Sequence, residues 1–208
     1  MHRRVGQTVR SYMQEHQMHY VFTVVLFAMG IIFGSIVAGS LAQPQKQELF
    51  SFIQYFFLDL QEHGVPDANA QFQHSFGYYL KMVGIMWVFG LSVIGLPIIL
   101  LLLFLKGMMV GFTVGFIVNQ LKWQGILFSL TGILPQNMLI VPALLIVGVS
   151  GTAFSLRLMR TRFLFKKGEI LPYFATYTAT AAGMLAILTI AALFEAFVTP
   201  HLMQYVLK

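Results

Sequence analysis

The sequence predicts an all-α fold, a polytopic integral membrane helical bundle of about five transmembrane helices with a short or re-entrant middle region. Four long, mostly apolar stretches carry no Asp, Glu, Lys or Arg: His16–Gln45, Met82–Leu105, Trp123–Leu156 and Ile170–Phe194. A helix of about 20 apolar residues crosses a bilayer core, and a soluble domain has little use for several. With 208 residues, 58% of them hydrophobic and 10% charged, the chain has room for a single membrane domain, residues 1–208.

Positive charges gather beside the apolar stretches. Three arginines precede the first stretch, and five basic residues lie between the last two: Arg3, Arg4 and Arg10, then Arg157, Arg160, Arg162, Lys166 and Lys167. Because loops rich in Lys and Arg stay in the cytoplasm, we expect the amino terminus inside and the carboxyl terminus outside a cell membrane. The same distribution argues against nucleic acid as a partner, since nucleic-acid binding needs a basic folded face.

The first span is expected at residues 20–42. It ends at Ser40-Leu41-Ala42, whose small-x-small form would also suit a cleaved signal peptide. The apolar run is longer than the 7–15 residues usual in a signal peptide, so we expect a retained anchor.

The remaining spans are expected at residues 78–105, 107–121, 135–156 and 172–198. Pro97, in Gly95-Leu96-Pro97, predicts a kink within the span over residues 78–105, and Lys106 is expected at its cytoplasmic end. The third span is short, with Lys122 and Trp123 at the outer interface. Residues 126–134 would then form a surface-lying or re-entrant helix.

An amphipathic outer helix is expected at residues 45–63, in the outer loop. Its apolar stripe recurs at helical spacing and is rich in aromatic residues: Leu49, Phe50, Ile53, Phe56, Phe57 and Leu60. Such a helix lies on the lipid surface, packs on its own spans, or binds a partner. We interpret the stripe as a candidate partner-binding surface.

Two small-residue repeats predict close helix packing. Gly107, Gly111 and Gly115 form one, and Gly30 and Gly34 form the other. Glycine at this spacing lets helix backbones approach in lipid. The repeats leave open whether the contact forms within one chain or between two copies in a homodimer.

Three polar residues interrupt the expected spans. Glu195 lies near the end of the last span, and Gln136 and Asn137 follow Pro135. Acids inside a membrane are costly and often functional, although Glu195 could instead reach interfacial water or accept a hydrogen bond from a neighbouring span. The two amides are expected to hydrogen-bond a helix break.

No cofactor or metal is expected, and the chain is not expected to be an enzyme. Asp59 and His63 share a helix face, but no metal-binding motif such as HExxH fixes a geometry. With no cysteine, disulfides and thiolate metal sites are excluded. Nucleophile elbows, paired intramembrane acids and phosphate-binding loops are also missing.

Several segments together resemble the stage II sporulation protein M (SpoIIM) family. They are the basic amino terminus, LFAMGIIFGS, KGMMVGFTVGF, GILPQNMLIVPALL and AALFEAFVTP. The family segment PHGxxExPA reads PQNMLIVPA here, so its His, Gly and Glu are replaced and any chemistry they perform is lost. Glu195 matches the family's EAFVTP element.

The resemblance implies a role in forespore engulfment at the sporulation septum. The family's partners are stage II sporulation proteins D and P, which degrade peptidoglycan. We therefore expect a non-enzymatic scaffold that assembles and localises these hydrolases. The alternative is a small transporter, channel or permease-like subunit, because interrupted helices often line substrate sites.

Overall fold

The parts of the chain that the structure describes are helical, which confirms the all-α prediction. The computed structural model describes residues 17–62, 67–163 and 170–199. Its elements, in chain order, are α2 (Gln17–Ser40), α3 (Gln43–Glu62), α4 (Ala68–Gly90), α5 (Gly95–Phe128), the π-helical turn η1 (Ser129–Ile133), α6 (Leu134–Phe163) and α7 (Leu171–Phe197).

Three helical stretches are long and apolar enough to cross a bilayer by length and composition. They are Met18–Ser40, Gly95–Met159 and Leu171–Phe197, and the second runs through α5, η1 and α6. Helices of this kind identify a membrane protein.

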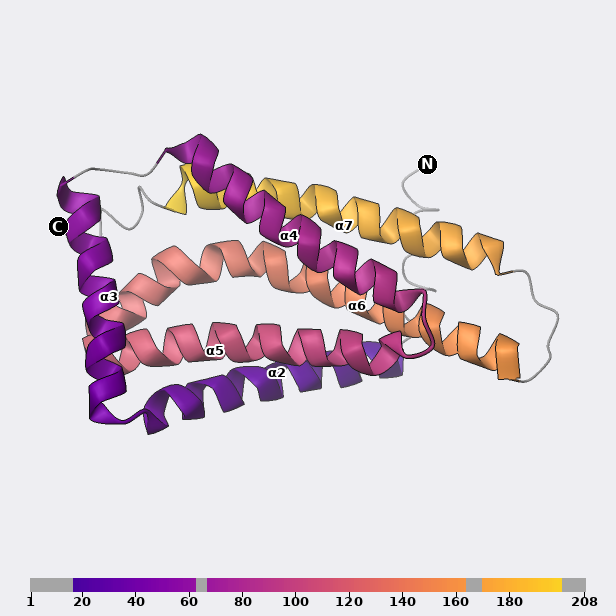
Figure 1. Ribbon diagram of the computed structural model, residues 1–208, viewed down its shortest axis with the longest axis horizontal. Coiled ribbons are helices and arrows are strands. Elements are labelled where there is room, and N and C mark those ends of the chain that lie inside the picture. The colour runs from indigo at the N-terminus through magenta and orange to yellow at the C-terminus, as the bar shows by residue number, and fades with distance from the viewer. Residues whose placement is uncertain (1–16, 63–66, 164–169, 200–208) are drawn as a thin grey trace.

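Five long helices, α2, α4, α5, α6 and α7, lie side by side, while α3 crosses one end of the bundle (Figure 1). We call this the α3 end; α5 finishes there and α6 begins there. At the opposite end α2 begins, α6 finishes beyond Arg157, and α7 begins at Leu171. We call this the basic end. The core lies between α4, α5, α6 and α7, where the fully buried apolar side chains include Met86, Ile99, Leu103, Ile140, Leu144, Val147 and Leu188.

The prediction of one kinked helix over residues 78–105 is wrong. α4 ends at Gly90, a four-residue turn (Leu91–Ile94) follows, and α5 begins at Gly95 and runs back toward the α3 end (Figure 1). Pro97 lies in the first turn of α5, where a missing N–H breaks no helical hydrogen bond. A Cβ at Gly95 would overlap the carbonyl oxygen of Phe89, so this tight reversal requires glycine. Ser155 Oγ donates to the Ser92 carbonyl oxygen at 2.7 Å and ties the turn to α6.

The middle region folds back at Lys122. Its φ of 51° and ψ of −121° lie outside the helical region and separate the straight part of α5 from its last residues. Gly125 then comes so close to the Ile117 carbonyl oxygen and Val118 that a Cβ would overlap them. The chain continues through η1 into α6, which contains Pro142. A helical segment does follow Trp123 as expected, but it is continuous with α6.

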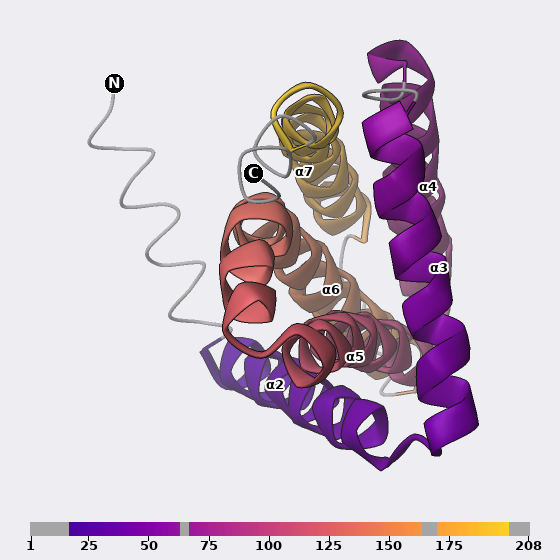
Figure 2. The same cartoon turned by 90° about the vertical axis from the view of Figure 1, so that its left-hand side faces the viewer.

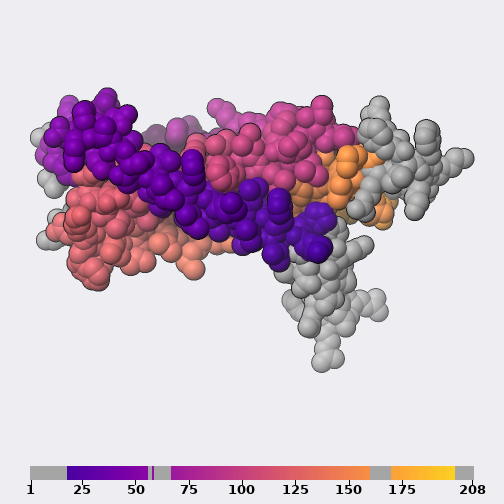
Figure 3. Space-filling model, turned by 90° about the horizontal axis from the view of Figure 1, so that it is seen from below, coloured from indigo at the N-terminus to yellow at the C-terminus, as the bar shows by residue number. Residues whose placement is uncertain are grey.

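The predicted glycine repeats meet each other within one chain. α2 lies along one face of the bundle, seen from below in Figure 3, and packs mainly on α5. A Cβ on Gly30 would overlap the carbonyl oxygen of Phe104, and one on Gly34 that of Met108. In return, Gly107 lies against Phe27, Gly111 against Ile31 and Gly115 against Ser35. We call this contact the glycine seam. The sequence left open whether the glycine repeats pack within one chain or between two copies, and here they pack within one chain.

Candidate functional site

A cavity of about 240 Å³ lies between α4, α5, α6 and α7, toward the α3 end. Its wall is unusually polar for the interior of an apolar bundle. The polar lining residues are His74, Ser75, Tyr78, Tyr79, Lys106, Thr113, Gln136, Asn137 and Glu195. All three polar residues singled out in the sequence, Glu195, Gln136 and Asn137, therefore share one site.

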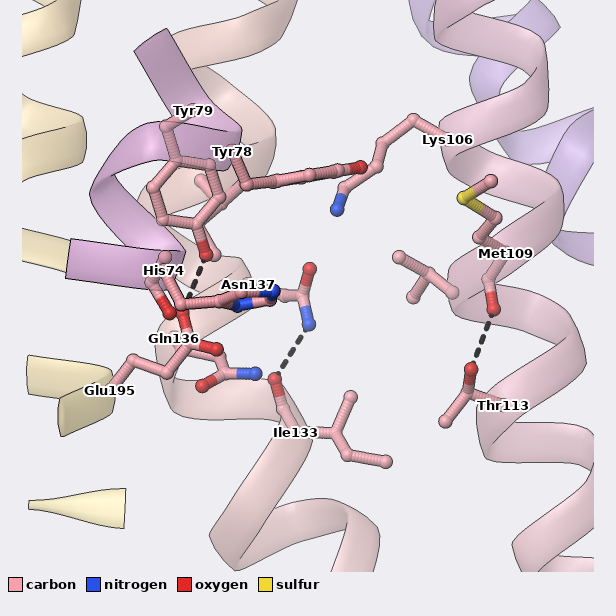
Figure 4. A pocket seen from close by; sticks show the side chains of 13 residues that line it. His74, Tyr78, Tyr79, Lys106, Met109, Thr113, Ile133, Gln136, Asn137 and Glu195 are labelled. Atoms are coloured by element: carbon pink, nitrogen blue, oxygen red, sulfur yellow. Dashed lines mark hydrogen bonds between the residues drawn. The ribbon is translucent and has the colours of Figure 1, made fainter. Parts of the chain in front are cut away.

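Glu195 is held by a tyrosine from a different helix. Tyr79 Oη on α4 donates a hydrogen bond of 2.7 Å to Glu195 Oε2 on α7 (Figure 4). Tyr79 is only 4% exposed, so little water competes for this bond. A hydrogen bond to an ionised acceptor is about twice as strong as one between neutral groups. The Tyr79–Glu195 bond therefore holds α4 against α7.

Lys106 places a positive charge on the opposite wall. Its Nζ lies 5.0 Å from the ring centroid of Tyr78, a cation–π contact. Figure 4 shows the ammonium pointing across the cavity toward the Asn137 amide. Among the residues that the structure describes, no carboxylate and no hydrogen-bond acceptor holds this ammonium. The expectation that Lys106 marks a cytoplasmic helix end is therefore wrong: it lies about 16 Å along α5 from Gly95, at 1.5 Å per residue.

Gln136 and Asn137 come from the start of α6, just after the π-helical turn. Asn137 Nδ2 donates to the Ile133 carbonyl oxygen at 2.8 Å, so it hydrogen-bonds the irregular backbone as the sequence suggested. Gln136 Oε1 is buried and accepts no hydrogen bond from the described part of the chain. Burying an acceptor without a partner costs about 1–3 kcal/mol of folding free energy. A ligand with a hydrogen-bond donor would recover this cost at Gln136 Oε1.

The cavity opens on the side of α4 and α5. Four lining residues there are exposed, His74 and Tyr78 on α4 and Met109 and Thr113 on α5. The deeper lining residues Ser75, Tyr79 and Ile140 are buried. The exposed lining residues therefore place the mouth between α4 and α5. These two helices join at their turn and separate toward the α3 end (Figure 1).

The family model described as stage II sporulation protein M matches residues 23–200. The chain belongs to this family. It is thus a sporulation-related membrane protein, and the match includes every helix that lines the cavity. Searches of the curated proteins and of the solved structures found no match.

Helix α3 of this SpoIIM-family protein carries a second candidate surface. α3 lies across the bundle end and in front of it in Figure 2. Of the predicted stripe, Leu49, Phe50 and Ile53 are half-buried, and the side chains of Phe56, Phe57 and Leu60 lie outside the described residues. Phe52, Tyr55 and Leu58, which are not among these six residues, are exposed on α3.

Sequence reasoning missed the partners of Glu195 and the lysine of the site. Tyr79 has no local signal, because its role depends on α4 lying beside α7. Lys106 has one, since it is a lone cation between two apolar runs, Met82–Leu105 and Gly107–Leu121. Within the described residues, no group of three or more His, Cys, Asp or Glu is placed to hold a metal ion.

Proposed function

We propose that this protein is a non-enzymatic membrane scaffold that assembles peptidoglycan-degrading enzymes during forespore engulfment. Its family membership supports a sporulation role. The observation that carries the scaffold role is the exposed aromatic surface of α3. Phe52 is 68% exposed and Tyr55 77% exposed, on a helix that packs only lightly on the rest of the protein.

The proposal includes five membrane crossings, by α2, α4, α5, α6 and α7. These helices lie side by side, and the basic end collects Arg157 with the sequence-adjacent Arg160 and Arg162. Since basic loops stay in the cytoplasm, α3 would lie on the outer face, where peptidoglycan is. A reporter fused near residue 60 tests this orientation: activity of an extracytoplasmic reporter is expected, and activity of a cytoplasmic reporter contradicts it.

The exposed face of α3 has the properties of a docking surface. Phe52, Tyr55 and Leu58 are spaced three residues apart, so they share one side of the helix. The half-buried Leu49 and Ile53 lie on a different side of α3. The helix therefore carries apolar side chains that the rest of the protein does not cover. Aromatic residues dominate protein interfaces because they bury large areas at small entropic cost. The proposed partners are the stage II sporulation proteins D and P.

A pull-down from membranes tests this docking surface. The double variant Phe52→Ala/Tyr55→Ala is expected to lose at least about tenfold of the recovered partners, since two interface aromatics commonly contribute 2 kcal/mol or more. Phe22→Ala is the matched control, because Phe22 is 56% exposed but belongs to α2 near the basic end. Unchanged recovery of both hydrolases with the double variant would remove α3 from the proposal.

The non-enzymatic part has its own test. Purified protein incubated with peptidoglycan is expected to release no soluble fragments. Release by the protein alone would show that the chain itself cuts the wall.

A transporter or channel is the second candidate, and the polar cavity is the observation that favours it. However, the core between the cavity and the basic end is apolar and closed, with Met86, Ile99 and Leu103 fully buried. A solute path would have to open this layer. Flux into proteoliposomes that Glu195→Gln abolishes would favour this function over the scaffold.

A further inference from the structure

The polar cavity opens between α4 and α5, two of the five helices that the proposed function places across the membrane. At this mouth, the lining residue Met109 has an exposed apolar side chain. Such side chains face lipid tails when these helices cross a bilayer. A ligand that enters through this mouth comes from the lipid phase or from its interface.

The charge that this mouth offers is Lys106. Its ammonium reaches into the cavity and contacts only the Tyr78 ring among the residues that the structure describes. A cation is costly at this depth and normally has an anionic partner. Among the described residues, no carboxylate lies within ion-pair distance of this ammonium, which leaves the charge of Lys106 available to an external anion.

The size and remaining charges of the cavity narrow the choice of anion. A volume of about 240 Å³ lies below the roughly 300–1,000 Å³ of typical small-molecule sites, so it accepts a head group and not a whole lipid. Glu195, on the far wall, repels a second negative charge. A phosphodiester carries a single negative charge, whereas a phosphate monoester carries about −1.5 to −2 at neutral pH.

We propose that this cavity binds the phosphodiester head group of a membrane phospholipid, with Lys106 holding the phosphate. The amide of Asn137, toward which Lys106 points, lies on the same path into the cavity (Figure 4). The Gln136 Oε1 on the inner wall is buried and accepts no hydrogen bond from any described residue, and a hydroxyl or amine of a head group would supply the donor. This inference rests on the five membrane crossings of the proposed function, and it holds whether or not α3 recruits hydrolases.

Native mass spectrometry of the full chain, extracted from nanodiscs into a maltoside detergent, tests the proposal. The nanodiscs contain phosphatidylglycerol mixed with a phosphate-free galactosyl diacylglycerol. The wild-type protein is expected to retain one phosphatidylglycerol in preference to the galactolipid. Lys106→Met is expected to reduce that retention by about tenfold, the size expected for losing one charge-assisted hydrogen bond, and Lys106→Arg to keep most of it.

Lys81→Met is the matched control. It removes the same charge from an exposed position on α4 that does not line the cavity, and it is expected to retain the lipid as the wild type does. Because methionine suits an apolar helix, Lys106→Met is expected to elute in size-exclusion chromatography as the wild type does. Equal lipid retention by Lys106→Met and the wild type overturns the proposal, as does equal retention of the galactolipid.

A soluble phosphate is the other source of the same chemistry, and a second arm separates the two. In lipid-free detergent, glycerophosphoglycerol, the soluble phosphodiester left when phosphatidylglycerol loses its acyl chains, is expected to leave the melting temperature unchanged. Added phosphatidylglycerol is expected to raise it for the wild type and for Lys81→Met. Stabilisation by glycerophosphoglycerol that depends on Lys106 would show that the site takes a soluble phosphodiester, which overturns the lipid assignment.

Discussion

Helix α5 contacts its neighbours α2 and α4 in opposite ways. Against α2, glycines on both helices bring backbones together along most of the length of α2. Against α4, the helices meet near their connecting turn and then diverge around a polar cavity. Small residues thus let α5 contact α2 closely on one side, while on the other side larger polar residues line a cavity between α5 and α4.

This difference follows from what drives packing in lipid. Burying an apolar side chain against another helix gains little there, because lipid tails are equally apolar. Close backbone contact and interhelical hydrogen bonds then decide where helices touch. The glycine seam uses the first, and the α4–α7 contact uses the second, through Tyr79 and Glu195 and through Tyr177 Oη, which donates to the Met86 carbonyl oxygen at 2.9 Å.

Gly111→Ala is the change expected to damage the seam most. Its Cβ would overlap the carbonyl oxygen of Ile31, a backbone atom that cannot rotate away, so the helices must separate. We expect a loss of about 2–3 kcal/mol in unfolding free energy, the upper part of the range for overpacking. Reversible unfolding in mixed micelles, followed by circular dichroism, measures it.

Gly84→Ala is the control for this change, since nothing lies within 4 Å of its Cβ position. It is expected to be neutral or slightly stabilising, because alanine favours a helix. Equal destabilisation by Gly84→Ala and Gly111→Ala would mean that the seam has no special role.

Gly115→Ala sharpens the same test at a gentler contact. Its Cβ would meet the Ser35 Cα at 3.0 Å and the Ser35 Cβ at 3.3 Å, which requires a shift of a few tenths of an ångström. We expect a loss of about 1 kcal/mol, at the lower end of the overpacking range. The order Gly111 above Gly115 above Gly84 is the prediction, and a reversal of the first two contradicts the contact geometry.

A double-mutant cycle on Tyr79→Phe and Glu195→Met tests the hydrogen bond between α4 and α7, because methionine is close to glutamate in size and has no oxygen acceptor. Interhelical hydrogen bonds in membrane proteins contribute about 0.6 kcal/mol on average and at most about 1.7. Because Glu195 is a charged acceptor and Tyr79 is buried, we expect a coupling of about 1–1.5 kcal/mol. A coupling near zero would show that the two side chains are neighbours without being partners.

The sequence foretold the seam better than the cavity, for a physical reason. Gly107, Gly111 and Gly115 follow the helical period, so their shared face is visible along one segment. The cavity combines single residues from four helices, and only Glu195, Gln136 and Asn137 looked out of place in their own segments. Tyr79 and Tyr78 are ordinary residues in a membrane helix until their neighbours are known.

The turn between α4 and α5 could not be predicted from the sequence, because it contains no charged residue that would mark a helix end. Leu91-Ser92-Val93-Ile94 lies in the middle of the charge-free stretch Met82–Leu105, so the second half of α4 and the first half of α5 looked like a single span. Pro97 fits a kink inside a helix and the first turn of a new helix equally well, so the sequence alone does not distinguish the two. With Lys106 then misplaced at a helix end, its position inside the bundle could not be foreseen.

Ser35→Ala gives the smallest expected effect and separates the two ways in which the seam is held. Ser35 Oγ on α2 donates to the Gly111 carbonyl oxygen at 3.0 Å, so the seam contains a hydrogen bond as well as close backbone contact. We expect a loss of only about 0.6 kcal/mol, because the carbonyl keeps its helical partner and alanine fits the space. The same unfolding measurement as for Gly111→Ala applies. A loss as large as that of Gly111→Ala would show that the hydrogen bond, and not the absence of side chains, holds α2 against α5, and the contrast between the two faces of α5 would disappear.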